Sequence, residues 1–237
     1  MEKKKAGEGA PLENHRIEDQ LLQQKPLRKP FRIILNIVLL GLFLISWAPR
    51  VLHQWAFNSG QKGDFHSALL YYNVATWINP NNARLYYGRG LTHAKLTQLD
   101  NALADFSKAI NLDPMFAAAY VGRCNIHNQQ QNFDSAIADC SKALELGTSE
   151  IVVYINRGVA YLAKEEDELA VTDLTKAVNL DGNSATVHCF LGVAYMRTHK
   201  FSEAIASFER GIKLDSNNEA KWCQTALINA RQVIPAP

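Results

Sequence analysis

Small and apolar residues recur along most of this chain at intervals of 34 positions. One column contains only alanine, namely Ala68, Ala102, Ala136, Ala170 and Ala204. A second column is small throughout and consists of Ala56, Gly90, Cys124, Gly158 and Gly192. A third is aliphatic and consists of Ile78, Leu112, Leu146, Leu180 and Leu214. This periodicity is typical of stacked helical units, and no strand pattern accompanies it.

The small columns predict two closely packed antiparallel helices, A and B, in each interval. With intervals starting at residues 49, 83, 117, 151 and 185, small residues fall at position 8 of helix A and position 20 of helix B. They let the helix axes approach to about 8 Å. Cys124 and Cys140 occupy positions 8 and 24 of the third interval, which we interpret as a partial exchange of volume. Larger residues fill position 24 elsewhere: Tyr72, Phe106, Leu174 and Phe208. Polar residues expected to cap helix B stand near its start: Asp100, Asp134 and Ser202.

At this point the sequence resembles the tetratricopeptide repeat (TPR) family. The family's 34-residue helix–turn–helix carries the pattern W-x2-L-G-x2-Y, then A-x3-F, then P. The second interval matches this pattern with Tyr86-x2-Arg89-Gly90-x2-His93, then Ala102-x3-Phe106, then Pro114. The resemblance covers residues 49–233, and the first interval departs from it most, with Leu52, Trp55 and Ser59 at the motif positions.

The resemblance implies an all-α fold, a right-handed TPR α-solenoid with a concave inner surface. Five repeats are predicted, followed by a capping helix over residues 219–233. Their ranges are 49–82, 83–116, 117–150, 151–184 and 185–218. They are preceded by a polar tail, 1–30, expected to be disordered, and by an apolar segment, 31–48.

Three arginines recur at position 7, and three aspartates recur at position 23 of the same repeats. The sets are Arg89, Arg123 and Arg157, and Asp105, Asp139 and Asp173. Where the arginine is missing the aspartate is missing too, since Leu191 accompanies Ser207 and Trp55 accompanies Tyr71. This predicts a ladder of structural ion pairs that use the guanidinium fork. The sequence leaves open a ligand-binding role for the arginines, and whether each pair forms within or between repeats.

The repeat register also interprets the histidines and cysteines. His93 and His127 share position 11 with Tyr161 and Tyr195, which favours a packing role. Cys189 and Cys223 share position 5 one repeat apart. Because neighbouring helices stand near 10 Å apart, we expect both to be free thiols.

The composition offers no support for catalysis or for nucleic-acid binding. The net charge is only +2, so the chain lacks the excess of basic residues that DNA or RNA binding needs. No catalytic or phosphate-binding motif is present, so we expect no enzyme activity, cofactor or metal. The run KEEDE at 164–168 is interpreted as a solvated turn.

The apolar segment predicts a single membrane-spanning anchor. Residues 33–48 contain no charge, and basic residues precede them. They cover about 24 Å as a helix, slightly less than the hydrocarbon core of a bilayer. A helix buried against the solenoid or a partner, and a signal peptide, are the alternatives. The basic residues upstream place the N-terminus in the cytoplasm and the repeats across the membrane, whereas unpaired cysteines favour a reducing compartment.

TPR proteins bind peptide segments on the inner face of the A helices, and this implies a candidate groove. An amide cluster from the third repeat lies beside an apolar stretch from the fourth, with cations toward the ends. Amides suit an extended peptide backbone, and the apolar stretch suits side chains. Some of these residues have the alternative of facing neighbouring helices. The set is Arg84, Tyr87, Leu91, Lys95, Asn125, Asn128, Gln129, Ile155, Val159, Leu162, Met196 and Arg197.

The family includes chaperone adaptors whose carboxylate clamp holds an acidic C-terminal tail. Asn125 and Asn156 match the two asparagines of that clamp, but Val121, Thr186 and Phe190 stand where its cations should be. A chaperone tail is therefore not expected as the ligand. We expect a membrane-tethered scaffold that binds a partner protein through an extended peptide or a helix. It would aid assembly or recruitment of a membrane-associated complex, similar to bacterial and plastid assembly factors. The alternative is a stoichiometric structural subunit of such a complex.

Overall fold

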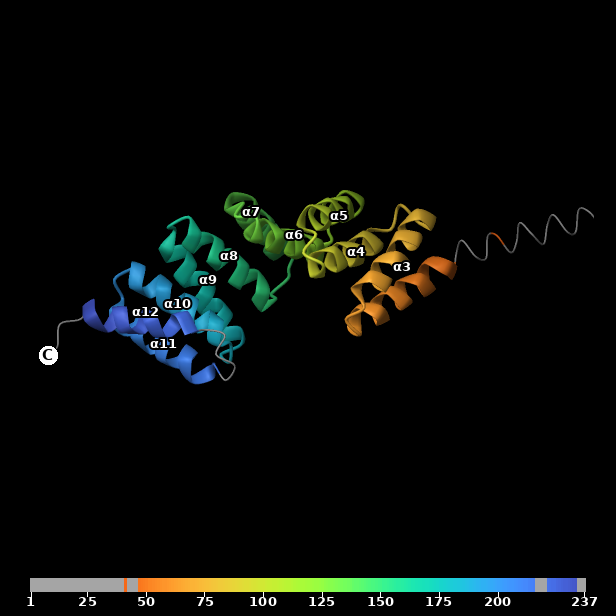
Figure 1. The fold of residues 1–237 in the computed structure, drawn as a ribbon. Helices are drawn as coiled ribbons and strands as arrows, with labels where there is room; N and C mark the ends of the chain where they lie inside the picture. Colours follow the sequence, from red (N-terminus) through yellow and green to blue (C-terminus); the bar gives the residue numbers. More distant parts are fainter. Residues whose placement is uncertain (1–40, 42–46, 216–220, 234–237) are drawn as a thin grey trace, which may run out of the picture. The chain divides into compact units, whose positions relative to one another are not determined.

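The computed structural model describes residues 41, 47–215 and 221–233. One compact unit runs from Ala48 to Pro237. The residues 47–215 and 221–233 form eleven α-helices, namely a helix over 47–61 and ten helices labelled in Figure 1. The A helices are α4 (Ala83–Lys95), α6 (Ala117–Gln129), α8 (Ile151–Ala163) and α10 (Ala185–Arg197). The B helices are α3 (Phe65–Ile78), α5 (Leu99–Leu112), α7 (Phe133–Glu145), α9 (Asp167–Leu180) and α11 (Phe201–Leu214), and the last helix is α12 (Lys221–Val233).

The predicted membrane anchor lies outside the described residues, apart from positions 41, 47 and 48. Within the part of the chain that the structure describes, no helix is both long enough and apolar enough to span a bilayer. The polar tail 1–30 also lies outside the described residues.

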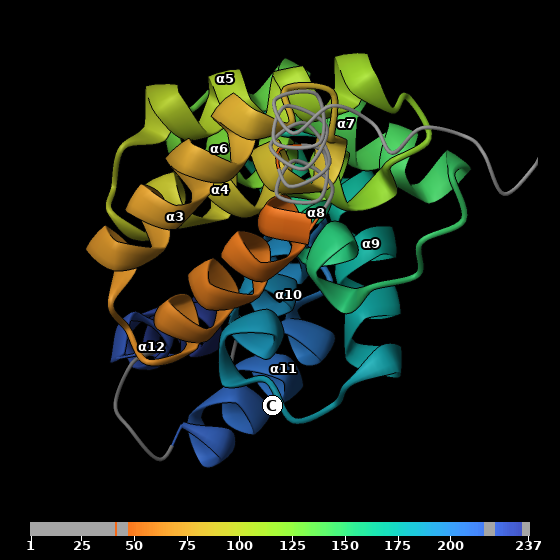
Figure 2. The same ribbon diagram turned by 90° about the vertical axis from the view of Figure 1, so that its right-hand side faces the viewer.

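The helices pack in an order that makes the A helices an inner layer. Each A helix contacts its own B helix and the B helix before it, and α4, α6, α8 and α10 also contact one another in succession. Among the labelled helices, no B helix contacts the B helix of the next repeat. Figure 2 accordingly has the A helices toward the middle of the unit and α5, α7, α9 and α11 toward its periphery. This is the arrangement of an α-solenoid.

The packing at positions 8 and 24 follows the pairing of small with large residues. A Cβ added to Gly90 would lie 2.9 Å from the Phe106 ring, and one added to Gly192 would lie 2.5 Å from the Phe208 ring. Both phenylalanines are fully buried. In these two repeats, glycine at position 8 therefore makes room for the phenylalanine at position 24.

The prediction that Cys189 and Cys223 are free thiols is wrong, because the four cysteines form two disulfides. Cys124 and Cys140 are bonded within the third repeat, with their Cα atoms 5.6 Å apart. They occupy positions 8 and 24, which also face each other in the second, fourth and fifth repeats. What the sequence presented as an exchange of volume is therefore a covalent link between α6 and α7.

The second disulfide joins Cys189 of α10 to Cys223 of α12, again with Cα atoms 5.6 Å apart. The expected 10 Å is a distance between helix axes. Each facing Cα atom lies about 2.3 Å from its own axis, on the side of the other helix, so the two Cα atoms are closer together than the axes. A separation of roughly 5.4 Å follows, which is within the range of a disulfide. Gly211 leaves the space, since a Cβ there would lie 2.6 Å from the sulfur of Cys189.

The B helices begin one or two residues earlier than expected. The residues flanking their starts are Gln98, Asn132, Glu166 and Lys200, and none of these four makes a side-chain capping bond. Asp100, Asp134 and Ser202 therefore lie inside the first turn and do not cap it. In α3, by contrast, Asp64 accepts a bond from the backbone N–H of Ser67.

The A–B turns share one backbone conformation at position 15. The residues there have φ between 57° and 78°, in the left-handed region, and only the first is glycine. They are Gly63, Thr97, Gln131, Glu165 and His199.

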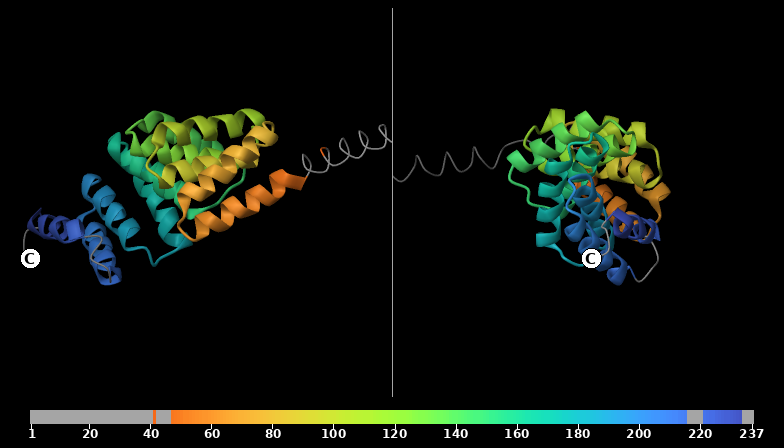
Figure 3. Two further views of the ribbon diagram at one scale, coloured as in Figure 1. Left: turned by 45° about the vertical axis from the view of Figure 1, so that its right-hand side comes forward. Right: turned by 90° about the vertical axis from the view of Figure 1, so that its left-hand side faces the viewer.

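The last repeat is closed by α12, which is the described part of the predicted helix 219–233. Leu227 and Ala230 of α12 pack with Ala204 and Phe208 of α11 in one apolar cluster. In Figure 3 the three helices α10, α11 and α12, coloured blue, lie together. The apolar edge of the fifth repeat is thereby covered.

Candidate functional site

The structure forms all three arginine–aspartate pairs, each within one repeat. The Nε of Arg157 donates to Asp173 Oδ2 over 2.7 Å and its Nη2 donates to Oδ1 over 2.9 Å. Arg89 and Arg123 make the same two bonds to their own aspartates, at 2.7 to 2.8 Å. The aspartate side chains are between 5 and 9% exposed. The pairs therefore fix helix A against helix B.

A third contact extends each arginine to the preceding repeat. The Nη1 of Arg157 donates to Ser141 Oγ over 2.9 Å, and that of Arg123 donates to Ser107 Oγ over 3.1 Å. Arg89 makes the equivalent bond to Asn73 over 3.1 Å. These acceptors all occupy position 25, a polar column that the sequence already contained. Each guanidinium thus links three helices and two repeats.

Aromatic rings and histidines complete the surroundings of the ladder. The guanidinium carbon of Arg157 lies 5.8 Å from the ring centroid of Tyr161, within cation–π range. The hydrogen bond with Asp173 raises the pKa of Arg157. The Nε2 of His127 lies 3.7 Å from the Oδ2 of Asp139. Burial lowers the pKa of His127, and the charge of Arg123 lowers it further. Charge and packing together make this a structural network that joins neighbouring helices.

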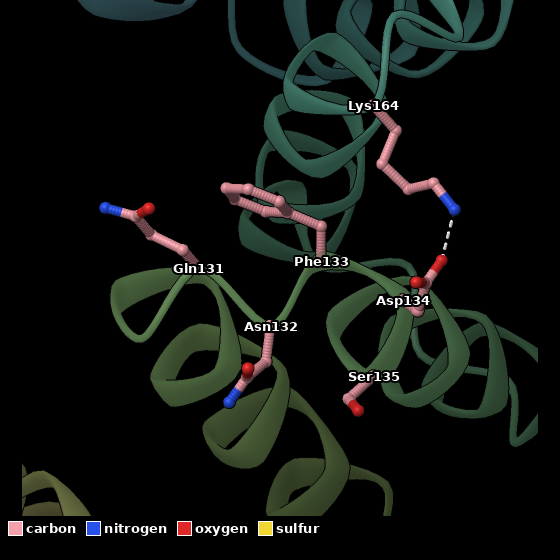
Figure 4. A pocket seen from close by; sticks show the side chains of 6 residues that line it. All are labelled: Gln131, Asn132, Phe133, Asp134, Ser135 and Lys164. Atoms are coloured by element: carbon pink, nitrogen blue, oxygen red, sulfur yellow. Dashed lines mark hydrogen bonds and ion pairs between the residues drawn. The ribbon is translucent and has the colours of Figure 1, made fainter.

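The turns carry a second ladder, which the sequence did not reveal. Gln130 Nε2 donates to Asp100 Oδ1 over 2.8 Å, and Lys164 pairs with Asp134. Figure 4 shows this lysine reaching from its own turn to the start of α7, beside a small polar hollow. Arg197 donates to Asp167 over 3.3 Å. The first-turn acids of one repeat therefore accept bonds from the end of helix A or the turn of the next repeat. One of these donors is Lys164, which belongs to the run interpreted as a solvated turn.

The predicted groove residues fall into three groups by exposure. Leu162 is only 7% exposed and belongs to the core with Leu174 and Val187, so it is not a groove residue. The half-buried group is Tyr87, Asn125, Asn128, Ile155, Val159 and Met196, and the exposed group is Arg84, Leu91, Lys95, Gln129 and Arg197.

Some of the remaining groove residues are held by other contacts. Tyr87 packs between Phe106 and Phe116, with ring centroids 5.9 and 5.0 Å away, and burial raises its pKa. Arg197 is committed to the turn ladder and also donates to the Leu162 carbonyl over 2.6 Å. These two residues therefore hold helices together.

The amides of the third repeat form a cluster with Asn156 of α8. Asn128 Nδ2 donates to the Asn156 carbonyl over 2.7 Å, which links neighbouring A helices. Asn128 Oδ1 and Asn156 Nδ2 are buried and lack a protein partner. Gln129 donates to Asn125 Oδ1 along the outer edge of the cluster. Asn128 is thus a connector between repeats, and Asn125 with Gln129 forms the accessible part.

An apolar hollow beside Leu91 was not anticipated. It lies between the helix over 47–61 and α4, and its lining includes Phe57, Tyr72 and Lys95. Phe57 is 51% exposed and Leu91 is 42% exposed. Phe57 occupies position 9 of the first repeat, so the same column that supplied Leu91 would have identified it.

Comparison with protein families finds tetratricopeptide repeats in this chain. Two family models described as tetratricopeptide repeat match residues 83–116 and 185–218, and residues 151–184. These ranges coincide with the second, fifth and fourth predicted repeats. The human tetratricopeptide repeat protein 28 is 45% identical over 47 residues, which is 20% of this chain and 2% of that protein.

Solved structures of similar fold are tetratricopeptide proteins at low sequence identity. A MamA fragment from Desulfovibrio magneticus RS-1 is 20% identical over 73% of this chain and 98% of its own, with a TM-score of 0.65. YrrB, described as a TPR protein with an unusual peptide-binding site, is 22% identical over 68% of this chain and 82% of its own, with a TM-score of 0.61. Such repeats generally serve as interaction scaffolds. The chain is therefore an all-α solenoid that contains tetratricopeptide repeats.

Proposed function

We propose that this chain is a membrane-anchored scaffold that binds an extended segment of a partner protein on its A-helix layer. The observation that carries the proposal is the contact between α6, which bears amides that are at least partly exposed, and α8, which bears half-buried apolar side chains. Asn125 and Gln129 of α6 would offer hydrogen bonds to a peptide backbone, and Ile155 and Val159 are half-buried apolar residues of α8. The peptide-binding site named for YrrB, a protein of similar fold, supports the same reading.

The anchor part of the proposal depends on residues 33–48, which are uncharged and preceded by basic residues. The two disulfides support a placement of the repeats outside the reducing compartment. Both are buried, and disulfides persist in oxidising compartments. The basic residues before the anchor independently favour a cytoplasmic N-terminus with the repeats across the membrane. The cysteines, once paired, no longer oppose that orientation, and we propose a role in assembling or recruiting a membrane complex there.

The first test of the proposal is partner capture from native membranes after crosslinking, with the full chain as bait. Asn125→Ala should weaken capture by about ten-fold, or 1–2 kcal/mol, with little change in melting temperature. Val159→Glu should abolish capture, because a charge there would have to be desolvated against an apolar ligand. Asn128 is avoided as a probe, since its loss also removes the bond to Asn156.

The matched control is Lys176→Glu, an exposed change on the outer helix α9. It should leave capture intact. If the Asn125 and Val159 variants fold normally and retain full capture while the Lys176 variant loses it, the partner binds the outer face. A partner that co-purifies at fixed stoichiometry would instead indicate a structural subunit.

A further inference from the structure

The outer surface of the first repeat carries an exposed apolar stripe on α3. Leu70 is 62% exposed, Val74 is 39% exposed and Trp77 is 83% exposed. Their spacing of four and then three residues places them on one side of the helix. Large apolar side chains that gather on one exposed face indicate a binding surface.

The other repeats provide an internal comparison for this stripe. Its members occupy positions 22, 26 and 29 of helix B. At position 22 the later repeats carry Ala104, Ala138, Thr172 and Ala206. At position 26 they carry Lys108, Lys142, Lys176 and Arg210, and at position 29 Asn111, Glu145, Asn179 and Lys213. The fold therefore does not require apolar residues in these columns, and the first repeat differs for another reason.

Stacking of a further repeat would not cover the stripe. All twelve residues at these positions in the later repeats are exposed, although those repeats have neighbours on both sides. Helix B presents these columns away from the A-helix layer. Whatever covers the stripe must therefore approach the solenoid from outside.

The first repeat is also poor in charge. Residues 49–82 contain only three charged side chains, Arg50, Lys62 and Asp64, whereas each later repeat contains between six and nine. Two of the chain's four tryptophans lie in this repeat, Trp55 and Trp77. Trp55 is 52% exposed. A surface with few charged residues and with exposed tryptophan is typical of proteins at a membrane–water interface.

We infer that the Leu70–Val74–Trp77 stripe rests in the interfacial region of the lipid bilayer. The uncharged segment 33–48 ends one residue before this repeat, which holds the repeat close to the membrane surface. The inference deepens the proposed function and depends on its anchor. Lipid contact fixes the orientation of the first repeat, so that the A-helix layer has a set direction relative to the membrane.

Fluorescence quenching by brominated lipid tests the inference on the full chain reconstituted in phosphatidylcholine vesicles. One variant keeps only Trp77, and a control keeps only Trp222 of α12, which is 40% exposed. The other tryptophans are replaced by phenylalanine in each. Lipid chains brominated near the headgroup should quench Trp77 by about two-fold or more, because an interfacial indole lies at that depth. Trp222 should be quenched little.

A second variant uses the residues of the second repeat as a guide. Leu70→Ala with Val74→Lys introduces the side chains that Ala104 and Lys108 supply at the same columns, so the fold should be kept. In the Trp77-only protein this change should reduce quenching to the level of Trp222. Melting temperature and resistance to carbonate extraction should both be unchanged.

The outcomes separate the stripe from the anchor. Carbonate-resistant protein with unquenched Trp77 overturns the lipid contact and leaves the anchor standing. Protein that carbonate releases overturns the anchor, and the inference with it. Trp77 emission that is shifted to the blue but insensitive to brominated lipid means that a protein covers the stripe, which also overturns the assignment to lipid.

Discussion

Replacing Arg157 with leucine removes the centre of the three-helix link between the third and fourth repeats. The change deletes two bonds to Asp173 and one to Ser141, at 2.7 to 2.9 Å. It leaves the Asp173 carboxylate only 5% exposed and without its counter-charge. The protein must then either keep a buried unpaired charge or open the A–B contact to water.

The expected loss of stability follows from the burial of the two partners. Removing one member of a buried ion pair costs about 3–5 kcal/mol, whereas exposed pairs contribute about 0–1 kcal/mol. The Arg157 side chain is 20% exposed, so water can enter part of the vacated space. We therefore place Arg157→Leu near the lower end, at about 3 kcal/mol. For a chain of this length that corresponds to a melting temperature lower by roughly 6–12 °C.

The fifth repeat supplies the matched double substitution. It carries Leu191 and Ser207 at the same two positions, 5% and 8% exposed. The double substitution Arg157→Leu with Asp173→Ser introduces this uncharged pair into the fourth repeat and leaves no buried charge. The double variant should lose only about 1 kcal/mol, less than either single variant, because both charged groups are removed together.

Urea denaturation and thermal melts of the four proteins give the coupling free energy directly. A coupling of at least about 2 kcal/mol is expected for groups in direct contact. Denaturant midpoints should be read alongside the slope, since repeat arrays can unfold in stages. If the two single losses add to the double loss within about 0.5 kcal/mol, the pair contributes no specific interaction and the ladder reasoning is refuted.

Two further changes test the cross-links and the histidine beside the ladder. The disulfides close loops of 16 and 34 residues, for which chain entropy predicts a stabilisation of about 3 and 4 kcal/mol. The melting temperature of the reduced protein should therefore be well below that of the oxidised protein. Four titratable thiols in the untreated protein would contradict the pairing. Because burial lowers the pKa of His127, the unfolded chain binds its proton at higher pH, and stability should fall as pH drops below about 6.5. His127→Tyr introduces the residue type of Tyr161 and Tyr195. It should reduce the difference between the melting temperatures at about pH 7.5 and about pH 5.5. If that difference is unchanged, His127 is not the group that makes stability depend on pH.

The sequence alone determined the repeat and the pairing of its columns. A period of 34, with small residues at position 8 opposite large ones at position 24, is a packing constraint that each repeat must satisfy locally. Gly192 and Phe208 meet it with no room for a Cβ. The joint presence and absence of arginine and aspartate identified the two columns as partners, since a buried charge needs a counter-charge beside it. That each pair forms within one repeat was decided by the structure.

Other features depend on how closely the helices approach, and only the tertiary structure decided them. Cys189 and Cys223 are 34 residues apart in sequence, and their bond forms because facing Cα atoms lie nearer than the helix axes. Leu162 of α8 is buried in a cluster that combines Leu174 of its own repeat with Val187 of the next, so two repeats contribute to its burial. The partners of Asp100 and Asp134 come from the next repeat, 30 residues on, where the stacking angle brings the turns together. The sequence of each repeat determines its local packing, whereas the distances between repeats are determined by how the repeats stack.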